Sequence, residues 1–181
     1  GAGTLATYGR GGDYFRFYEI NPVVVDYARR DFSYLSGTRA RVEVATGDGR
    51  LLLESEADQN FDLLVVDAFS GDSIPVHLLT REAFALYLRH LKPGGVLALH
   101  VSNLYLKLQP VVRTLAGAVG RMSVPVVNGE DAREGVGLSW WALVGRREDL
   151  ARLGVDLGAQ LEPKKLPRLW TDDFSTLLAA L

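Results

Sequence analysis

The chain of 181 residues contains no cysteine, so disulfide bonds and thiolate metal sites are excluded. Its three histidines, His77, His90 and His100, lack the spacing of a metal site. No apolar run approaches the ~18 residues needed to cross a bilayer, and no signal peptide is recognisable. With 20 basic and 22 acidic residues there is no basic excess for a nucleic-acid surface. These absences favour a cytoplasmic globular protein with no metal, nucleic-acid partner or membrane insertion.

Short apolar runs alternate with amphipathic segments along the chain. We expect strands at 14–20, 41–46, 61–67, 96–101, 124–127 and 139–144, and helices at 22–32, 80–91, 106–120 and 147–153. Asn21-Pro22 and Thr80 are expected to begin two of these helices. Strands that alternate with helices predict a mostly parallel sheet with helices on both faces. The last two strands are separated only by a loop, which predicts an antiparallel pair.

The chain begins on glycines, with Gly1 and Gly3 before a short helical segment. Glycine-rich loops of this kind follow a strand in nucleotide-binding folds, and their backbone approaches a ligand closely. We therefore expect residues 1–181 to form a single domain whose first strand is truncated. The domain is expected to be the C-terminal part of a longer chain.

Two carboxylates at predicted strand ends suggest an adenosine pocket. Glu19 follows Gly3 by sixteen residues, near the spacing at which an acidic residue accepts hydrogen bonds from ribose. Asp48, beside Gly49, is placed to accept a hydrogen bond from an adenine amino group. A solvated strand end explains Glu19 equally well, and a turn explains Asp48. Together with Gly1 and Gly3, they favour adenosine binding.

The stretch 61–75 carries the strongest chemical signal. A β-branched apolar run at 63–66, typical of a strand buried on both faces, ends on Asp67, and a polar turn with Asp72 follows. Ligands of open parallel sheets bind beyond the carboxyl ends of the strands. A carboxylate at that place suits chemistry on a cationic substrate, so Asp67 is the predicted catalytic residue. Its alternative role is to cap the next turn.

Three polar residues finish the strand at 96–101. His100, Ser102 and Asn103 are expected to face the same crevice as Asp67, and we take Ser102 and Asn103 as candidate substrate-binding residues. A histidine at a strand end is also commonly structural.

Several motifs resemble those of class I S-adenosylmethionine-dependent transferases, and more specifically the spermidine-synthase-like aminopropyltransferases. The resemblance covers residues 1 to about 144 and is carried by Tyr18-Glu19-Ile20-Asn21-Pro22, Gly47-Asp48-Gly49-Arg50, Phe61-Asp62-Leu63-Leu64-Val65-Val66-Asp67 and Leu91-Lys92-Pro93-Gly94-Gly95. It implies a Rossmann-like α/β fold with a seven-stranded, mostly parallel sheet that ends in an antiparallel pair.

The resemblance also implies an activity. Such enzymes move an aminopropyl group from decarboxylated S-adenosylmethionine to a polyamine, without a metal. Their catalytic aspartate corresponds to Asp67, and a second aspartate corresponds loosely to Asp72. The resemblance further implies a homodimer, and the small N-terminal β-domain of the family is absent from these residues.

Departures from the family keep two alternatives open. Ala2 stands where spermidine synthases carry an aspartate that holds the aminopropyl amine of the donor, and the loop after Asp67 is longer than theirs. A methyltransferase that uses intact S-adenosylmethionine is one alternative. Residues 170–175 resemble the ending of domains that follow a transporter-like membrane segment. A non-catalytic adenosyl-ligand sensor attached to a transporter is therefore the other.

Overall fold

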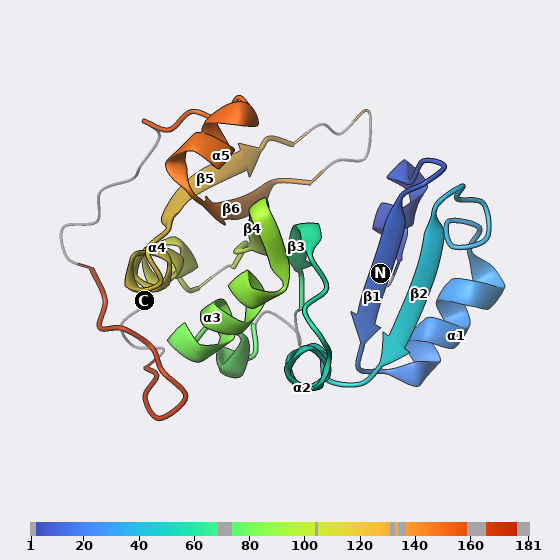
Figure 1. The fold of residues 1–181 in the computed structure, drawn as a ribbon, viewed down its shortest axis with the longest axis horizontal. Helices are drawn as coiled ribbons and strands as arrows, with labels where there is room; N and C mark the ends of the chain where they lie inside the picture. Colours follow the sequence, from blue (N-terminus) through green and yellow to red (C-terminus); the bar gives the residue numbers. More distant parts are fainter. Residues whose placement is uncertain are drawn as a thin grey trace. The chain divides into compact units, whose positions relative to one another are not determined.

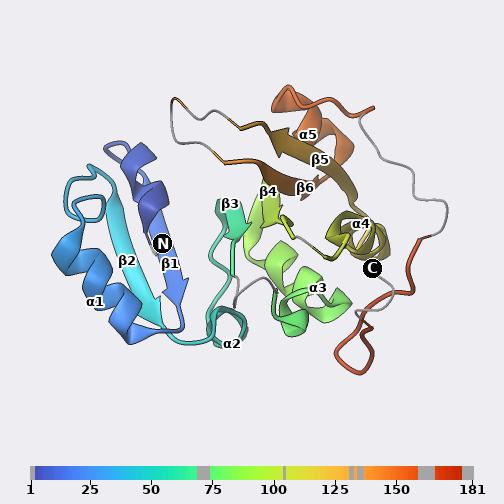
Figure 2. The same ribbon diagram turned by 180° about the vertical axis from the view of Figure 1, so that it is seen from behind.

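The computed structural model describes residues 3–68, 74–103, 105–130, 133, 137–158 and 166–176. Gly1 and Asp72 lie outside these described residues. The chain divides into two compact units, Gly1–Ala57 and Asp58–Leu181. Figures 1 and 2 show the elements of both units, and each unit is described by itself.

The first unit is built on two parallel strands. Its elements are η1 (Thr4–Tyr8), β1 (Tyr14–Glu19), α1 (Pro22–Asp31), β2 (Arg41–Thr46) and α2 (Gly49–Ser55). Parallel strands need a crossover, and α1 supplies it while it packs beside β1 and β2 (Figure 1). The predicted start of this helix is confirmed, because the side chain of Asn21 accepts a hydrogen bond from Val23 N–H and Pro22 occupies the first turn.

The second unit contains a four-stranded mixed sheet. Its elements are β3 (Phe61–Val66), η2 (Val76–Leu78), α3 (Arg81–Arg89), β4 (Leu91–His100), α4 (Leu108–Ala118), β5 (Met122–Asn128), β6 (Ser139–Gly145) and α5 (Arg147–Arg152). The strand order is β3-β4-β6-β5. In both views α5 lies across this sheet from α3 and α4 (Figures 1 and 2). Leu150 of α5 packs with Val96 and Val124 on its side of the sheet.

All six predicted strands are present, but the seven-stranded, mostly parallel sheet is not confirmed. The strands form a two-stranded parallel sheet and a separate four-stranded mixed sheet. In the latter, β3 and β4 are parallel, whereas β6 runs antiparallel to both β4 and β5. The predicted antiparallel pair is therefore confirmed. Because β6 lies between β4 and β5 and runs opposite to both, this one reversed strand forms two antiparallel pairs.

Two local expectations also differ from the structure. The segment 92–95, which separates the helix predicted at 80–91 from the strand predicted at 96–101, lies inside β4, where the pairing with β3 shifts register between Phe61 and Leu63. Gly94 has φ 89° there, a left-handed conformation that favours glycine. The strand predicted to be buried on both faces is partly exposed: Leu63 is 54% exposed, because β3 is the edge strand of its four-stranded sheet.

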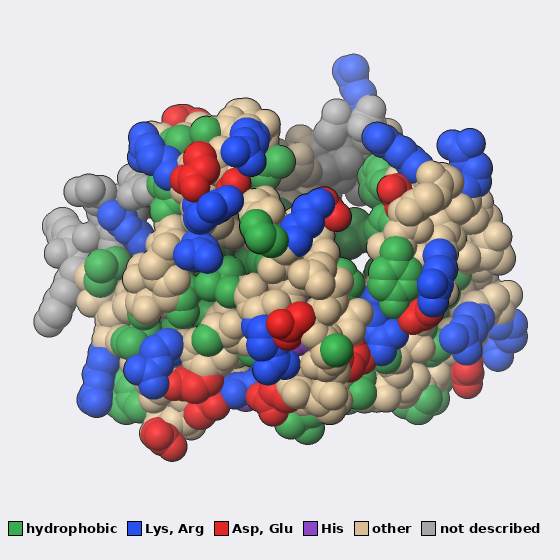
Figure 3. Space-filling view, viewed as in Figure 1, with side chains coloured by type: hydrophobic (Ala, Val, Ile, Leu, Met, Phe, Trp, Pro, Cys, Tyr) green, Lys and Arg blue, Asp and Glu red, His purple; other side chains and the backbone are tan. Residues whose placement is uncertain are grey.

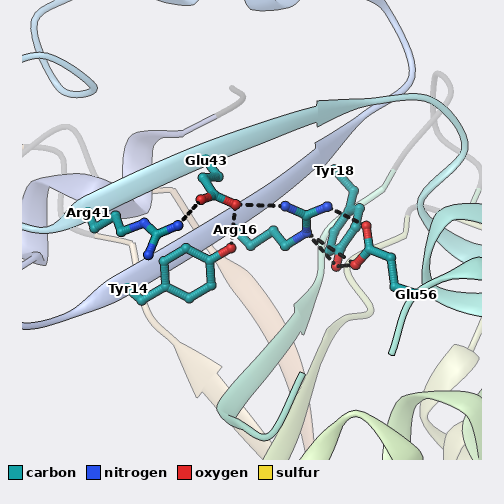
Figure 4. Close-up of polar contacts among 6 residues, drawn as sticks. All are labelled: Tyr14, Arg16, Tyr18, Arg41, Glu43 and Glu56. Atoms are coloured by element: carbon teal, nitrogen blue, oxygen red, sulfur yellow. Dashed lines mark hydrogen bonds and ion pairs between the residues drawn. The ribbon is translucent and has the colours of Figure 1, made fainter. Parts of the chain in front are cut away.

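A polar network covers one face of the first sheet (Figure 4). Side chains alternate along a strand, so residues two apart share a face. The network joins Tyr14, Arg16 and Tyr18 of β1, Arg41 and Glu43 of β2, and Glu56, which follows α2.

Arg16 is the centre of this network. Its guanidinium lies 2.9 Å from Glu43 Oε2 and forms a second ion pair with Glu56. The Tyr18 hydroxyl donates to Glu56 Oε2 over 2.7 Å, and burial raises its pKa, with a further rise from that hydrogen bond. The side chains of Arg16 and Glu56 are only 19% and 16% exposed. The network therefore ties the end of α2 to β1 through largely buried charges.

We expect Glu56→Ala to weaken the first unit by roughly 1–3 kcal/mol, because it removes a partner from a largely buried guanidinium. Residue-resolved amide hydrogen exchange in β1 and β2 would measure this, since all three tryptophans lie in the second unit. The control is Asp31→Ala, which breaks an exposed pair with Arg30 and should leave the protection of these amides essentially unchanged. Equal losses in the two variants would contradict a special role for the network.

Candidate active site

Asp67 and His100 meet at the carboxyl ends of two neighbouring parallel strands. Val66, the last residue of β3, pairs with Leu99 of β4, so the next residues along both strands lie side by side. Asp67 Oδ1 is 2.7 Å from His100 Nδ1. Sequence reasoning placed both residues at strand ends, and the parallel register brings them into direct contact.

The other nitrogen of the same imidazole contacts a serine. His100 Nε2 lies 2.7 Å from Ser102 Oγ, and this oxygen accepts a hydrogen bond of 2.8 Å from Trp140 N–H. The ring of His100 stacks on Trp141, with centroids 4.8 Å apart. The hydrogen-bonded series Asp67–His100–Ser102 is therefore held in place at the ends of β3 and β4 and by contacts with β6.

The exposed fractions of the Asp67 and His100 side chains differ in a way that suits catalysis. The side chain of Asp67 is 55% exposed, whereas that of His100 is 22% exposed. The carboxylate is accessible to a molecule from solution, while stacking and two hydrogen bonds orient the imidazole. An arrangement of this kind can attract a cation and accept a proton.

The other two predicted substrate-binding residues have different positions. Asn103 Oδ1 accepts hydrogen bonds from the N–H groups of Tyr105 and Leu106, at 2.8 and 2.7 Å, shortly before α4 begins. Asp72 lies outside the described residues. Substrate binding by Ser102, Asn103 and Asp72 stays a prediction.

In the first unit, Glu19 and Asp48 lie at the same edge of a parallel pair. Glu19 ends β1 opposite Thr46, which ends β2, and Gly47 N–H donates to the Glu19 carbonyl over 3.0 Å. The Glu19 side chain accepts a hydrogen bond of 2.9 Å from Asn21 N–H, which supports the start of α1. The structure thus places the two residues predicted to bind adenosine at the same edge of the two-stranded sheet.

Asp48 caps helix α2. Its Oδ1 accepts hydrogen bonds from Arg50 and Leu51 N–H groups, at 2.9 and 3.0 Å. A Cβ at Gly49 would lie 3.3 Å from the Cβ of Tyr18, so glycine lets the helix begin close against β1. Asp48 therefore has a structural role as a helix cap rather than in a turn, and adenine binding stays a prediction.

Gly3 begins η1 in a left-handed conformation, with φ 94°. It is buried, and a Cβ built there would collide with Leu35 at 2.3 Å. Close packing is thus one reason for glycine at this position. Contact of this glycine with a cofactor stays a prediction, as does that of Gly1, which the structure does not describe.

Charge and metal-ligating groups are dispersed in the part of the chain that the structure describes. Figure 3 shows acidic and basic side chains interspersed on the face drawn. No cluster of three or more histidine, aspartate or glutamate side chains within the described ranges could hold a metal ion. Likewise, none of the helices described is both long and apolar enough to cross a membrane.

Comparison with known proteins places this geometry in context. No protein-family model matches the chain. A polyamine aminopropyltransferase of Vibrio vulnificus is 30% identical over 150 residues, which cover 80% of the chain and 48% of that protein. Putrescine N-methyltransferase 2 of Nicotiana tabacum is 28% identical over 100 residues, covering 54% of the chain and 28% of that protein. The chain thus spans at most about half the length of these relatives.

Solved structures show the fold. A probable spermidine synthase from Corynebacterium glutamicum superposes with a TM-score of 0.52 at 20% identity, covering 72% of the chain and 46% of that protein. Human methyltransferase-like protein 13, in complex with SAH, gives a TM-score of 0.55 at 19% identity and covers 76% and 66%. The chain has a spermidine-synthase-like form of the S-adenosylmethionine-dependent methyltransferase fold, which confirms the resemblance seen in its motifs.

The cap on α2 gives a prediction that separates structure from binding. Replacing Asp48 by alanine removes the acceptor for two N–H groups and should destabilise α2 by about 0.5–2 kcal/mol. Asp48→Asn is the matched control, because asparagine caps helices about as well as aspartate. Hydrogen exchange of the α2 amides measures both variants. Loss of protection in the asparagine variant equal to that in the alanine variant would contradict this role of the side chain.

Proposed function

We propose that this chain is the catalytic domain of a transferase that moves an aminopropyl group from decarboxylated S-adenosylmethionine to a polyamine. The observation that carries the proposal is the exposed carboxylate of Asp67, oriented by His100 at the carboxyl ends of β3 and β4. The Vibrio relative, named for polyamine aminopropyl transfer, supports it.

The donor is assigned to the first unit. Glu19 would hold the ribose hydroxyls and Asp48 the adenine amino group, with the backbone of Gly1, Gly3 and Gly49 close to the ligand. Support comes from the position of the two carboxylates at adjacent strand ends and from the SAH complex of the human structural neighbour.

The chemistry explains why a carboxylate is needed at the acceptor side. A protonated amine is attracted by Asp67, oriented, and must lose one proton before its nitrogen has a free electron pair. The nitrogen then attacks the methylene carbon beside the sulfonium. The new C–N bond forms as the C–S bond breaks, and the electron pair of that bond returns to sulfur as a neutral thioether.

Methyl transfer from intact S-adenosylmethionine to an amine is the second candidate. The specific observation that favours it is the similarity to a plant protein named putrescine N-methyltransferase. The same carboxylate would orient the amine, and the attacked carbon would be the methyl group of the sulfonium.

Calorimetry and product analysis would test these assignments. We expect the protein to bind decarboxylated S-adenosylmethionine more tightly than the intact form, and to yield methylthioadenosine with putrescine as acceptor. Methylated putrescine as the product would favour the second candidate. Tight binding without a product from a panel of amines would indicate a sensor. Absence of binding to all adenosyl ligands at millimolar concentration would overturn the adenosine assignment.

Asp67→Asn is expected to reduce kcat by roughly 100-fold or more, because it removes the charge that attracts the amine and supports its deprotonation. Donor affinity should stay within about twofold of the original, since the proposed donor residues lie elsewhere in the sequence. The matched control is Asp62→Asn, an exposed aspartate of β3 that pairs with Lys92. A rate unchanged by Asp67→Asn would remove Asp67 from the mechanism.

A further inference from the structure

We infer that His100 is the group that accepts the proton of the attacking amine, and that the hydroxyl of Ser102 carries the proton to it. In this assignment Asp67 supports the imidazolium and does not itself take the proton. The inference rests on the proposed function, because it concerns the amine acceptor of that reaction. It adds two residues with defined roles, His100 as the base and Ser102 as the proton carrier.

The hydrogen-bond partners determine which atoms carry protons. An ionised carboxylate only accepts hydrogen bonds, so the contact with Asp67 places the ring proton on His100 Nδ1. In the neutral ring Nε2 is then the acceptor, and its partner at 2.7 Å is Ser102 Oγ. The N–H of Trp140 also donates to this oxygen, so the single proton of the hydroxyl can point at Nε2. The hydrogen bonds from Nδ1–H to Asp67, from the Ser102 hydroxyl to Nε2 and from Trp140 N–H to Ser102 Oγ can therefore form at the same time.

The same pattern defines a proton path. The ammonium nitrogen gives one proton to Ser102 Oγ as the serine proton passes to His100 Nε2. The amine becomes neutral and keeps its electron pair, the ring becomes an imidazolium, and serine is regenerated unchanged. Asp67 holds the positive ring through Nδ1–H, which is how a carboxylate supports histidine in a serine–histidine–aspartate triad. After transfer, the imidazolium releases its proton to solvent.

General chemistry favours an imidazole over a carboxylate as the base. Imidazole side chains ordinarily bind a proton more strongly than carboxylates by about two pKa units, and a base works best near the operating pH. Asp67, which follows β3 and contacts the His100 ring, is charged, whereas Trp141 of β6 and Ser102, which also contact the ring, are neutral. The negative charge of Asp67 thus stabilises the protonated ring.

The pH dependence of kcat/KM tests the assignment. The original protein should lose kcat/KM on the acid side of its pH profile (an acid limb), because a protonated imidazole cannot accept the proton of the amine. His100→Gln keeps an N–H donor for Asp67 but binds no proton, so the limb should disappear and kcat should fall by roughly 100-fold or more. Ser102→Ala should lower kcat by roughly 10-fold or more and keep the limb, because the base is present but the path is broken.

Controls separate catalysis from folding. Donor affinity by calorimetry should remain within about twofold in both variants. Ser123→Ala, the same substitution on β5, should leave rate and profile unchanged. Imidazole added to His100→Ala should restore part of the rate, a result that damage to the fold does not produce.

The outcomes distinguish this inference from the proposed function. Absence of any transfer by the original protein defeats both. An active protein whose acid limb survives His100→Gln, or disappears only in Asp67→Asn, overturns the role of His100 and leaves the proposed reaction intact. A full rate in Ser102→Ala overturns the serine path, because the amine would then reach the imidazole directly.

Discussion

The hydrogen bond between Asp67 and His100 is the interaction on which the candidate site depends. It joins the ends of two parallel strands, and its geometry follows from the register that pairs Val66 with Leu99. A shift of one residue would turn one of the two side chains to the opposite face of the sheet. The buried residues of β4, among them Leu97 and Leu99, oppose such a shift because they fill the core. Packing of the sheet therefore maintains the orientation of the carboxylate.

In the first unit, ion pairs and hydrogen bonds, rather than apolar packing, hold the elements that carry the candidate residues. Arg16 forms ion pairs with both Glu43 and Glu56. The hydroxyl of Tyr18, the residue before Glu19 in β1, adds a hydrogen bond to Glu56. These contacts tie α2, which Asp48 caps, to the strand that Glu19 ends. The residues proposed to bind the donor are thus attached to elements that these contacts hold together.

Much of the local structure was predictable because short segments determine it. Asn21-Pro22 and Thr80 begin their helices as expected, since a capping side chain needs only N–H groups two or three residues ahead. Six apolar runs form six strands. The pairing was less predictable: β6 contacts both β4 and β5, and the segment 92–95, expected to lie outside the strands, is an irregular part of β4. Pairing depends on residues far apart in sequence, whose packing no local pattern describes.

The residue types of the candidate site and their positions at strand ends were determined by the sequence alone. Asp67 follows an apolar run, Glu19 ends β1, and Asp48 lies two residues after β2. The motifs around them indicated the fold that the structural neighbours confirm. Only the tertiary structure decided that His100 contacts Asp67 through one nitrogen and Ser102 through the other. The physical reason is that Asp67 and His100 are 33 positions apart in the sequence. They come into contact only once the parallel register and the core behind it are formed.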